Sequence, residues 1–464
     1  MERSASLQAS EPAPRRTRGG ARVPPGPKRP LLGPLIAPGA DPLALFVRLS
    51  KTYGDIVRFR MRGDGAFLIS HPDLIRDVLV THQKNFTKSR ALERAKKLLG
   101  EGLLTSEGTT HLRQRRLLQP AFHRDRVASY ARTMVECAER TRSRWTNGAV
   151  MDVAGEMRRL TLAIVAKTLF SADVESQADE VGAALTRVLE SFWLTLLPFS
   201  DVIEMLPLPS LRRSHEARAR LDALIYQMIA ERRKSGRDDG DLLSMLLQAQ
   251  DEESSGLTDQ QVRDQAMTLM LAGHETTANA LAWTWYLLAQ SPDAEARLHE
   301  EIDRALRGRL PSFTDVPALP WTEQVVTESM RLYSPAWIVG RRAIADYPVG
   351  DYVIPARSLV FMSQYVVQRD GRFYQEPERF LPERWTPSFR SALPKFAYFP
   401  FGGGSRQCIG DSFAWMELVL LVATVGQQWQ FRLVPGHRVV PQPLITLRAR
   451  HGIKVTATRR YGRS

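Results

Sequence analysis

A cysteine near the C-terminal end has the surroundings most specific for chemistry. Cys408 lies in the segment FPFGGGSRQCIGD, which spans Phe399–Asp411 and follows the spacing F-x-x-G-x-R-x-C-x-G. A thiolate is a metal ligand, and glycines let the backbone pass close to a flat cofactor and direct N–H groups at the sulfur. The apolar run after Gly410 predicts a buried helix, whose N-terminal partial positive charge favours a thiolate. The segment therefore predicts that the sulfur of Cys408 binds the iron of a haem.

Three further residues of this segment have predicted roles around the sulfur. Gly402 lets the loop approach the cofactor, Phe401 is placed to shield the sulfur from water, and Arg406 is placed to reach a haem propionate. The competing interpretation is a turn that holds a buried, inert cysteine, which is true of most lone cysteines. The fixed spacing of Phe, Gly, Arg, Cys and Gly is hard to obtain by chance. On these residues the sequence resembles the cytochrome P-450 family of haem-thiolate monooxygenases.

The oxygen side of such a site is predicted from a long helical pattern. Residues Leu257–Pro292 have helical periodicity with Thr258 or Asp259 as N-cap, and the segment AGHETT (Ala272–Thr277) lies at the centre. A glycine in mid-helix costs about 0.5–1 kcal/mol relative to alanine, so we expect a compensating function. The resemblance implies that the helix opens locally at this segment and leaves a groove in which dioxygen lies above the iron.

Two residues of this segment, Glu275 and Thr276, match the acid–alcohol pair of the family. The resemblance implies that the Thr276 hydroxyl stabilises oxygen bound to the iron and that Glu275 helps to relay protons. A histidine in a haem protein invites assignment as an axial ligand. The family motif is variable at the position of His274 and directs that side chain away, so we do not expect His274 to bind the iron.

Basic residues elsewhere in the chain are candidates for binding the haem propionates. His111 and Arg115 are spaced i, i+4 in a predicted helix and share one helix face. The resemblance implies that both donate to propionates, whereas a solvated basic helix is the competing interpretation, because further arginines flank the pair. The resemblance also places Arg341, rather than Arg342, where the family often has a propionate-binding arginine. Arg357 stands where the family has glycine, so we expect a different turn there.

An E-x-x-R pair, Glu328 and Arg331, is singled out by its position and not by its spacing. The same spacing occurs several times in the chain, but this pair precedes the cysteine segment by 80 residues and is followed by LYSP. In the family its partner is an arginine of a P-E-R-F motif. The chain offers PERF at Pro377–Phe380 and PERW at Pro382–Trp385. Laying the family string P-E-x-F-x-P-E-R-F over both makes Arg384 the match, in a network that supports the cysteine loop structurally.

Apolar side chains predominate where the resemblance places the substrate pocket, which implies a hydrophobic substrate. They do not separate a lipid from a terpenoid, a steroid or a polyketide. The apolar connector at residues 191–210 is expected to roof the pocket, with a surface membrane contact as the alternative. The predicted wall residues are Leu98, Phe192, Leu269, Ala272, Pro335, Trp337 and Ile338.

Positive charge is concentrated at the two ends of the chain. The 464 residues carry a net charge of +14, of which residues 1–30 contribute +5 and residues 445–464 contribute +6. Nucleic-acid binding is one interpretation of such tails, but no nucleic-acid motif accompanies them. We interpret them as solvated tails and expect no nucleic-acid partner. Residues 1–24 are predicted to be a disordered basic tail, followed by a single domain over residues 25–464.

The number of cysteines and the hydropathy of the chain indicate the cellular compartment. The chain has two cysteines, Cys137 and Cys408, which indicates a reducing compartment and not a disulfide framework. The first thirty residues lack the apolar core of a signal peptide, and no stretch reaches the roughly 18–20 apolar residues that span a bilayer. We expect a cytoplasmic monomer with no membrane span.

The expected fold is mainly α with a smaller β-rich lobe, a long central helix and a cysteine loop before a C-terminal helix. The resemblance implies a monooxygenase that uses haem b and O₂ on a hydrophobic small molecule. About 50 residues follow the cysteine loop, too few for a flavin or iron–sulfur domain. Electrons would therefore come from a separate ferredoxin or flavodoxin and its reductase, with NAD(P)H used only indirectly.

Two alternatives to this function remain open. One is a haem-thiolate enzyme that uses peroxide or isomerises its substrate, against which Glu275 and Thr276 argue, because such enzymes commonly lack the pair. The other is a haem-binding sensor without catalytic activity.

Overall fold

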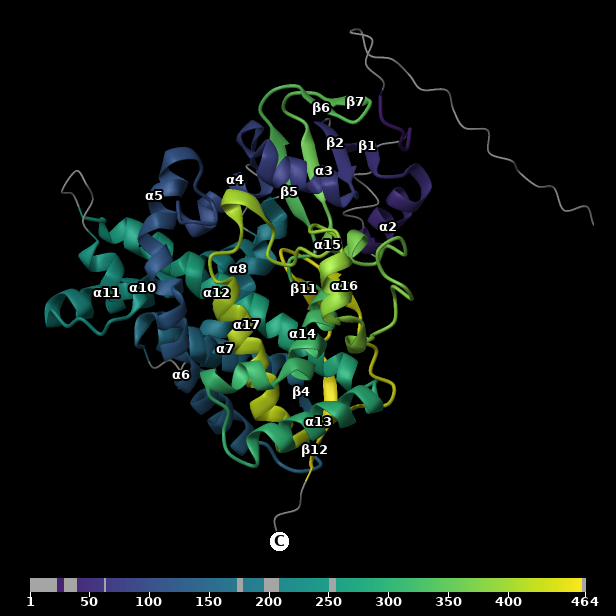
Figure 1. The fold of residues 1–464 in the computed structure, drawn as a ribbon. Coiled ribbons are helices and arrows are strands. Elements are labelled where there is room, and N and C mark those ends of the chain that lie inside the picture. The colour runs from purple at the N-terminus through teal and green to yellow at the C-terminus, as the bar shows by residue number, and fades with distance from the viewer. Residues whose placement is uncertain are drawn as a thin grey trace, which may run out of the picture.

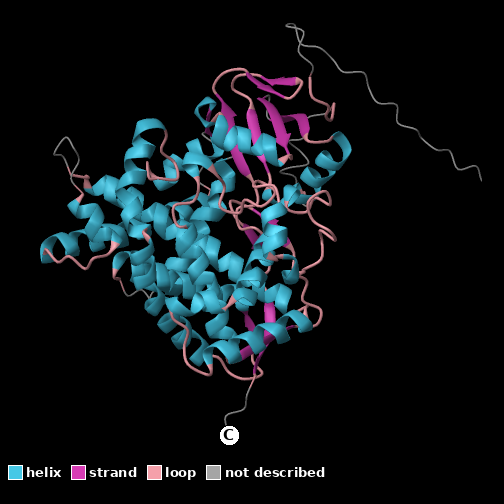
Figure 2. Ribbon diagram, viewed as in Figure 1, coloured by secondary structure: helices cyan, strands magenta, loops and turns pink. Residues whose placement is uncertain are grey.

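In a computed structural model, the chain forms a large helical body with a smaller sheet-containing part at one end (Figures 1 and 2). This confirms the predicted mainly α fold with a smaller β-rich part. No helix among the described residues is both long and apolar enough to cross a lipid bilayer. The described residues are 23–28, 40–61, 64–172, 178–195, 208–249 and 256–460.

The helical body is built mainly from long helices whose apolar residues form one large buried cluster. Two shorter helices, α2 and α15, pack against each other beside the sheet. The helices are α2 (Pro42–Tyr53), α3 (Pro72–Arg76), α4 (Arg90–Leu99), α5 (Gly108–Leu118), α6 (Arg124–Ser143), α7 (Val153–Phe170), α8 (Ala178–Thr195), α10 (Pro209–Ser235), α11 (Leu242–Gln248), α12 (Asp259–Leu288), α13 (Pro292–Leu306), α14 (Pro320–Leu332), α15 (Gln364–Val367), α16 (Pro387–Ala392) and α17 (Asp411–Gly426).

The main sheet has the strand order β1-β2-β8-β5-β3, with only β2 and β8 parallel. Successive residues of β2 enter different hydrophobic clusters, Phe67 on one face and Leu68 on the other, so both faces of the sheet are buried. The strands are β1 (Ile56–Met61), β2 (Asp64–Ile69), β3 (Phe86–Lys88), β4 (Val150–Asp152), β5 (Val339–Ala343), β6 (Tyr347–Val349), β7 (Tyr352–Ile354), β8 (Leu359–Met362), β9 (Trp429–Leu433), β10 (Pro441–Pro443), β11 (Leu447–Ala449) and β12 (Lys454–Arg459).

Helix α12 runs through the helical body and contacts α7, α10, α14 and α17. Thr258 is its N-cap, in a capping box with Gln261. The prediction that the helix opens at AGHETT is wrong for this structure, because α12 is an uninterrupted α-helix. Gly273 instead makes room for a neighbour. A Cβ there would lie 2.9 Å from a methyl carbon of Val165, so the glycine lets α7 approach α12 closely.

Two other local features were not predicted from the sequence. Residues 90–99 form α4, whose Ala95 and Leu99 are buried at i, i+4 spacing before Gly100 ends the helix with φ of 77°. The glycine-rich sequence after α4 hides this short pattern. Arg357, which stands where the family has glycine, adopts the left-handed conformation that favours glycine, with φ of 68°.

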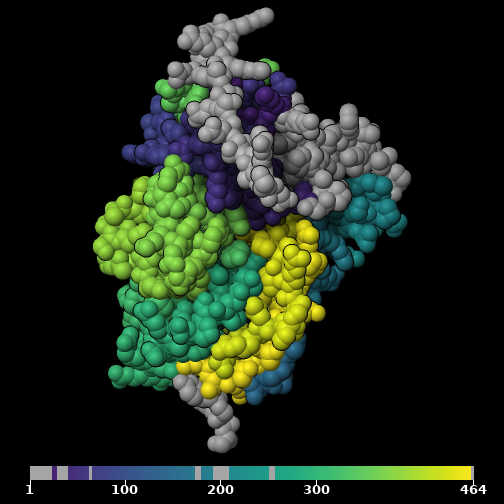
Figure 3. Space-filling model, turned by 90° about the vertical axis from the view of Figure 1, so that its right-hand side faces the viewer, coloured from purple at the N-terminus to yellow at the C-terminus, as the bar shows by residue number. Residues whose placement is uncertain are grey.

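The C-terminal segment lies beside elements from the middle of the chain. A side view shows residues near the C-terminus, in yellow, running down the same face as green segments near residue 300 (Figure 3). The antiparallel pair of β10 and β11 belongs to this C-terminal region. Residues that are far apart in the sequence are therefore available to build one site.

Candidate active site

The cysteine loop depends on glycines at two positions where the backbone has a positive φ. Gly402 and Gly404 both have φ of 72°. At Gly404 a Cβ would lie 1.9 Å from the carbonyl oxygen of Leu79, so no other residue fits there. The N–H of Cys408 donates to the carbonyl oxygen of Phe401 at 3.0 Å and closes the loop. These contacts present Cys408 at the start of α17, as the sequence predicts.

Cys408 is exposed to solvent, although its thiol is surrounded by many protein atoms. Burial raises its pKa to about 11, against the lowering effect of a hydrogen bond from Gly410 and of the nearby Arg115. In the protein without a bound metal, burial outweighs these lowering effects. The sulfur is exposed at the bottom of a buried environment, so a bound cofactor would cover it. Binding to a metal ion would then remove the proton from the thiol.

A short strip on α12, formed by Ala272, Gly273 and Thr276, is also partly exposed to solvent at the centre of the protein. Ala272, Gly273 and Thr276 are partly accessible, while the residues of α12 on both sides of them are buried. Ala272 and Thr276 are spaced i, i+4 and share one helix face, and Gly273 lies at the edge of that face toward α7. The strip carries one hydroxyl and no charge. It fits the oxygen side of a flat cofactor.

Four basic side chains gather around a single acid, Glu107. Glu107 accepts hydrogen bonds from Arg406 Nη2 at 2.6 Å and from the backbone N–H of Lys88 at 2.5 Å. Burial, together with Arg406 and Arg341, lowers the pKa of Lys88 to about 7. Burial and Arg406 lower the pKa of Arg341 to about 10, and burial and Lys88 lower that of His111. Burial is the largest cause of these shifts, and repulsion among the basic groups adds to it.

This cation cluster, defined as Lys88, His111, Arg341 and Arg406, has more positive charge than Glu107 balances. In addition, the Nε2 atom of His111 is buried and has no hydrogen-bond partner among the residues that the structure describes. Both features fit the two carboxylates of a haem, which would supply negative charge and acceptors. Haem b therefore fits the donor set on this side of the cysteine loop.

The remaining predicted propionate ligand, Arg115, contacts the cysteine loop directly. Its Nη1 atom donates to the carbonyl oxygen of Gln407 at 2.7 Å. Arg342, which sequence reasoning set aside in favour of Arg341, lies 4.0 Å from Glu93 and is more exposed than Arg341. The structure therefore brings His111, Arg341 and Arg406 together and places Arg115 against the loop.

Lys88 and Glu107 were missed by sequence reasoning. The signal that identifies Lys88 is strand pairing, because β3 pairs with β5 in a register that places Lys88 opposite Arg341. Glu107 is drawn into the same cluster by the N–H of Lys88.

The predicted acid–alcohol pair is held by quite different contacts. Thr276 Oγ1 donates to the carbonyl oxygen of Ala272 at 2.7 Å, within its own helix. Glu275 faces the C-terminal region, where its Oε1 atom accepts from Thr446 Oγ1 at 2.9 Å and forms an ion pair with Arg448. Neither of these two partners was predicted, because they lie more than 170 residues from Glu275.

His274 faces α7 and not the accessible strip. Its Nδ1 atom lies 3.2 Å from Thr161 Oγ1, which also donates to the backbone carbonyl of His274 at 3.0 Å. Burial lowers the pKa of His274 to about 4. A neutral histidine packed against α7 agrees with the expectation that it does not bind the iron.

The Glu328 network brings together the three residues predicted for it. Glu328 Oε2 and Oε1 accept from Arg331 Nε and Nη2, both at 2.8 Å, and Oε1 also accepts from Arg384 Nε at 3.0 Å. The Trp385 indole adds a hydrogen bond of 2.9 Å to Oε2, which a phenylalanine cannot make. Arg379, from the PERF segment, pairs with exposed Glu376 instead.

The predicted pocket residues divide into three groups. Leu98 and Leu269 pack in or against the large helical cluster, and Ala272 belongs to the accessible strip. The ring of Trp337 packs with Phe46 in the cluster beside the sheet. Pro335 is buried and Ile338 is partly buried, while the side chain of Phe192 and the connector after it lie outside the described residues.

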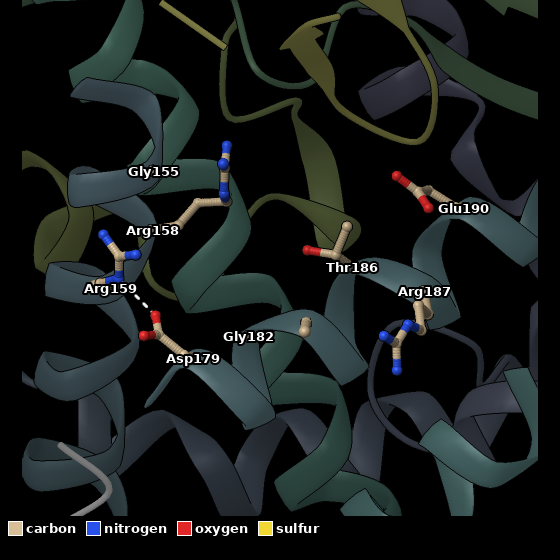
Figure 4. Close-up of a pocket in the computed structure, with 9 residues that line it drawn as sticks. Gly155, Arg158, Arg159, Asp179, Gly182, Thr186, Arg187 and Glu190 are labelled. Carbon is tan, nitrogen blue, oxygen red and sulfur yellow. Dashed lines mark hydrogen bonds and ion pairs between the residues drawn. The ribbon is translucent and has the colours of Figure 1, made fainter. Parts of the chain in front are cut away.

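A polar cleft of about 330 Å³ lies between α7 and α8, away from all of these residues. In Figure 4, Arg159 points toward Asp179, with which it forms an ion pair of 2.5 Å, while Arg187 and Glu190 lie at the other end. Opposite charges line this cleft and compensate one another. It shares none of the predicted site residues, so it does not account for the chemistry predicted at the cysteine loop.

Comparison with known proteins agrees with the site. The sequence matches the Cytochrome P450 family model over residues 23–455. It is 40% identical over 423 residues to cyclooctatin synthase of Streptomyces melanosporofaciens, with coverage of 90% of this chain and 92% of the relative. It is 39% identical to cyclooctat-9-en-7-ol 5-monooxygenase of the same organism, with coverage of 88% and 89%. The crystal structure of the cytochrome P450DA haem domain is similar at a TM-score of 0.85 and 28% identity, over 94% of this chain and 98% of that one. This chain therefore belongs to the cytochrome P450 family.

Proposed function

We propose that the hydrophobic substrate of this P450 monooxygenase is a cyclic terpenoid. The observation that carries the proposal is the accessible strip on α12, which offers a substrate apolar surface and the single hydroxyl of Thr276. An uncharged surface favours a substrate without a carboxylate or phosphate near the reacting carbon. Relatives that oxidise terpenoids, one of them named for a ring alcohol, support this substrate class.

Haem b, when bound, supplies activation of O₂ and transfer of one oxygen atom to the substrate. Cys408 is the residue that would hold its iron. Phe401, which packs against Trp415 at 5.8 Å between ring centres, would help to keep water from the sulfur. A dry sulfur is a stronger electron donor, because water no longer competes for its lone pairs.

The cation cluster would hold the propionates and thereby fix the cofactor against α12. Arg341 and Arg406 carry charge, and His111 Nε2 offers a hydrogen-bonding atom that has no partner within the described part of the chain. Arg115 would act from the loop side through its contact with Gln407. Charge-assisted hydrogen bonds to carboxylates are stronger than neutral ones, so this side would dominate cofactor orientation.

Thr276 and Glu275 would deliver protons to oxygen on the α12 side. The Thr276 hydroxyl is partly accessible and bonds only within its helix, so it is able to rotate toward a bound oxygen molecule. Glu275 is the adjacent carboxylate that is able to take up and release a proton. Positioned groups of this kind typically accelerate proton transfer by about 10²–10⁴-fold.

Electrons would come from a separate ferredoxin or flavodoxin. Arg115 and the exposed Arg116 lie on α5, which is joined to the cysteine loop by the Arg115–Gln407 hydrogen bond. A basic surface beside the loop favours an acidic partner and fast association at low salt. Reduction rates that fall steeply with ionic strength support this docking, and rates insensitive to salt contradict it.

Substrate class is tested by titrating the purified haem protein with ligands and following the Soret band. A cyclic terpenoid alcohol is expected to give a saturable spin-state shift, whereas palmitate and a steroid of matched hydrophobicity are not. Turnover under ¹⁸O₂ with a ferredoxin and its reductase should then place one labelled oxygen atom in the product. Saturable shifts with palmitate or the steroid, and none with terpenoids, would overturn the proposed substrate.

A further inference from the structure

One oxygen of Glu275 receives all of the hydrogen bonds that hold this side chain. Oε1 accepts from Asn279 Nδ2 at 2.8 Å, from Thr446 Oγ1 at 2.9 Å and from Arg448 Nε at 2.5 Å. The other oxygen, Oε2, is buried and has no partner among the described residues. The carboxylate is therefore anchored at one atom and free to accept a proton at the other.

Electrostatics determine the protonation state of this carboxylate. Burial opposes ionisation of Glu275, but attraction to Arg448, with hydrogen bonds from Arg448 and Asn279, outweighs it and holds the pKa below its usual range. Arg158 on α7 also faces His274 and disfavours its protonated form. Arg448 is thus the principal charge that keeps Glu275 ionised.

The strand that carries Arg448 is held in place by hydrogen bonds of the neighbouring residue, Leu447. Arg448 lies on β11, where the neighbouring Leu447 donates its N–H to the carbonyl oxygen of Pro335 at 2.9 Å. The carbonyl oxygen of Leu447 accepts from the indole N–H of Trp283, on α12, also at 2.9 Å. The strand therefore joins the Pro335 segment to the helix that carries Glu275.

We propose that Arg448 is the positioning residue of the proton relay in this P450. It anchors Glu275 through Oε1 and keeps it ionised, so that Oε2 is the atom that exchanges protons. In each cycle Oε2 takes one proton from solvent water and passes one proton toward Thr276, and Glu275 returns to a carboxylate. Only O–H bonds form and break in this exchange. The inference rests on the proposed role of Glu275.

The closing experiment compares Arg448→Met and Arg448→Lys in the haem-loaded enzyme. The first readout is the infrared band of a protonated carboxyl group as a function of pH, assigned by its loss in Glu275→Gln. Without Arg448 the effect of burial remains and raises the pKa, so Arg448→Met should move the band to higher pH by about one unit or more, a tenfold change in the equilibrium. Arg448→Lys keeps the charge and should shift it less.

The second readout is product formed per NAD(P)H oxidised, with the remaining electrons measured as hydrogen peroxide. Arg448→Met should lower this ratio on the order of tenfold, less than the hundredfold or greater effect expected for loss of an acid–base group itself. Thr446→Val removes one donor to Oε1 without changing charge and should lower the ratio about twofold to threefold, within the effect of one hydrogen bond. Arg450→Met, an exposed site near the end of the same strand, is the matched control and should behave as wild type.

The outcomes separate this inference from the proposed function. If Glu275→Gln and Thr276→Ala lower the ratio while Arg448→Met and Thr446→Val leave it unchanged, the positioning role is overturned and the relay stands. An unshifted carboxyl band in Arg448→Met also overturns it. If Glu275→Gln and Thr276→Ala keep the wild-type ratio, the proposed relay fails first. A merely structural role would lower folded yield in Arg448→Met without moving the band.

Discussion

Two carboxylates in this protein, one buried and one partly buried, are surrounded by basic groups, with opposite consequences. Glu328 is fully buried and accepts five hydrogen bonds, from Arg331, Arg384, the Trp385 indole and the backbone of Leu381. Glu107 has fewer donors and more positive charge around it than it balances. The first cluster is complete within the chain, whereas the second requires negative charge from outside.

This difference indicates that the Glu328 network stabilises the fold and that the cluster around Glu107 binds a ligand. A buried ion network with every acceptor used loses stability when one member is removed, because the others keep buried charges without partners. A cluster with surplus like charge has the reverse property, since removing one of its members relieves repulsion. Stability measurements with and without haem therefore test which description fits each cluster.

The largest effect is expected at the complete cluster. Glu328→Ala leaves the Arg331 and Arg384 guanidinium groups without their carboxylate and should lower the free energy of unfolding by about 3–5 kcal/mol. Little haem-loaded protein should be recovered. Urea unfolding and the haem-to-protein ratio measure both effects, with Glu383→Ala at an exposed neighbouring position as the control. Normal haem yield from Glu328→Ala would contradict the structural role.

The second effect concerns pH and the incomplete cluster. Lys88 has a folded-state pKa of about 7, below its ordinary value of 10.5, so the unfolded chain binds more protons between these pH values. Stability of the haem-free protein should therefore rise from pH 7 to 10.5, by roughly 2–4 kcal/mol from this group. Below pH 7 Lys88 is protonated in both the folded and the unfolded state, so it no longer makes the free energy of unfolding depend on pH.

Lys88→Met should abolish this rise in the haem-free protein. In the haem-loaded protein the slope should already be smaller, because carboxylates nearby favour charged Lys88. Chemical denaturation at several pH values, with and without haem, gives the comparison. Equal slopes in the two forms would mean that the cluster does not receive negative charge from the cofactor.

A smaller effect is expected when one donor is removed from Glu328. Trp385→Phe keeps the ring within the same aromatic cluster but deletes the hydrogen bond to Oε2. The free energy of unfolding should fall by about 1–3 kcal/mol, because a buried acceptor loses its partner. Unchanged stability in urea unfolding would show that the remaining four bonds suffice.

The smallest change in stability is expected at Arg357, which lies outside both clusters. Arg357 has a positive φ in the turn before β8. Arg357→Gly should raise stability by about 0.5–1 kcal/mol or leave it unchanged, since relief of backbone strain is partly offset by greater freedom of the unfolded chain. Thermal unfolding checks the direction, and clear destabilisation would mean that the arginine side chain contributes more than its conformation costs.

Local motifs carried most of what could be predicted from the sequence. Cys408, the AGHETT segment and the choice of Arg384 over Arg379 follow from residue spacing within short stretches. Lys88 was not predictable in this way, because its place depends on the register of β3 against β5. Arg448 and Thr446 depend on how a C-terminal strand returns to α12.

Other residues were recognised but misjudged because their surroundings were unknown. Gly273 was read as a sign of an open helix, whereas it accommodates Val165 of α7. Trp385 was treated as a replacement for phenylalanine, yet its indole N–H completes the bonding of Glu328. The Cys408 thiol shows the same limit, since its pKa depends on burial that no spacing reveals.

The surplus of positive charge around Glu107 has a consequence for how the protein matures. A newly made chain must hold Lys88, Arg341 and Arg406 near one another before any cofactor arrives, and repulsion among them lowers the local stability of that region in the haem-free form. Proteases act on locally opened segments. We therefore expect proteases to cleave the haem-free form faster than the haem-loaded form.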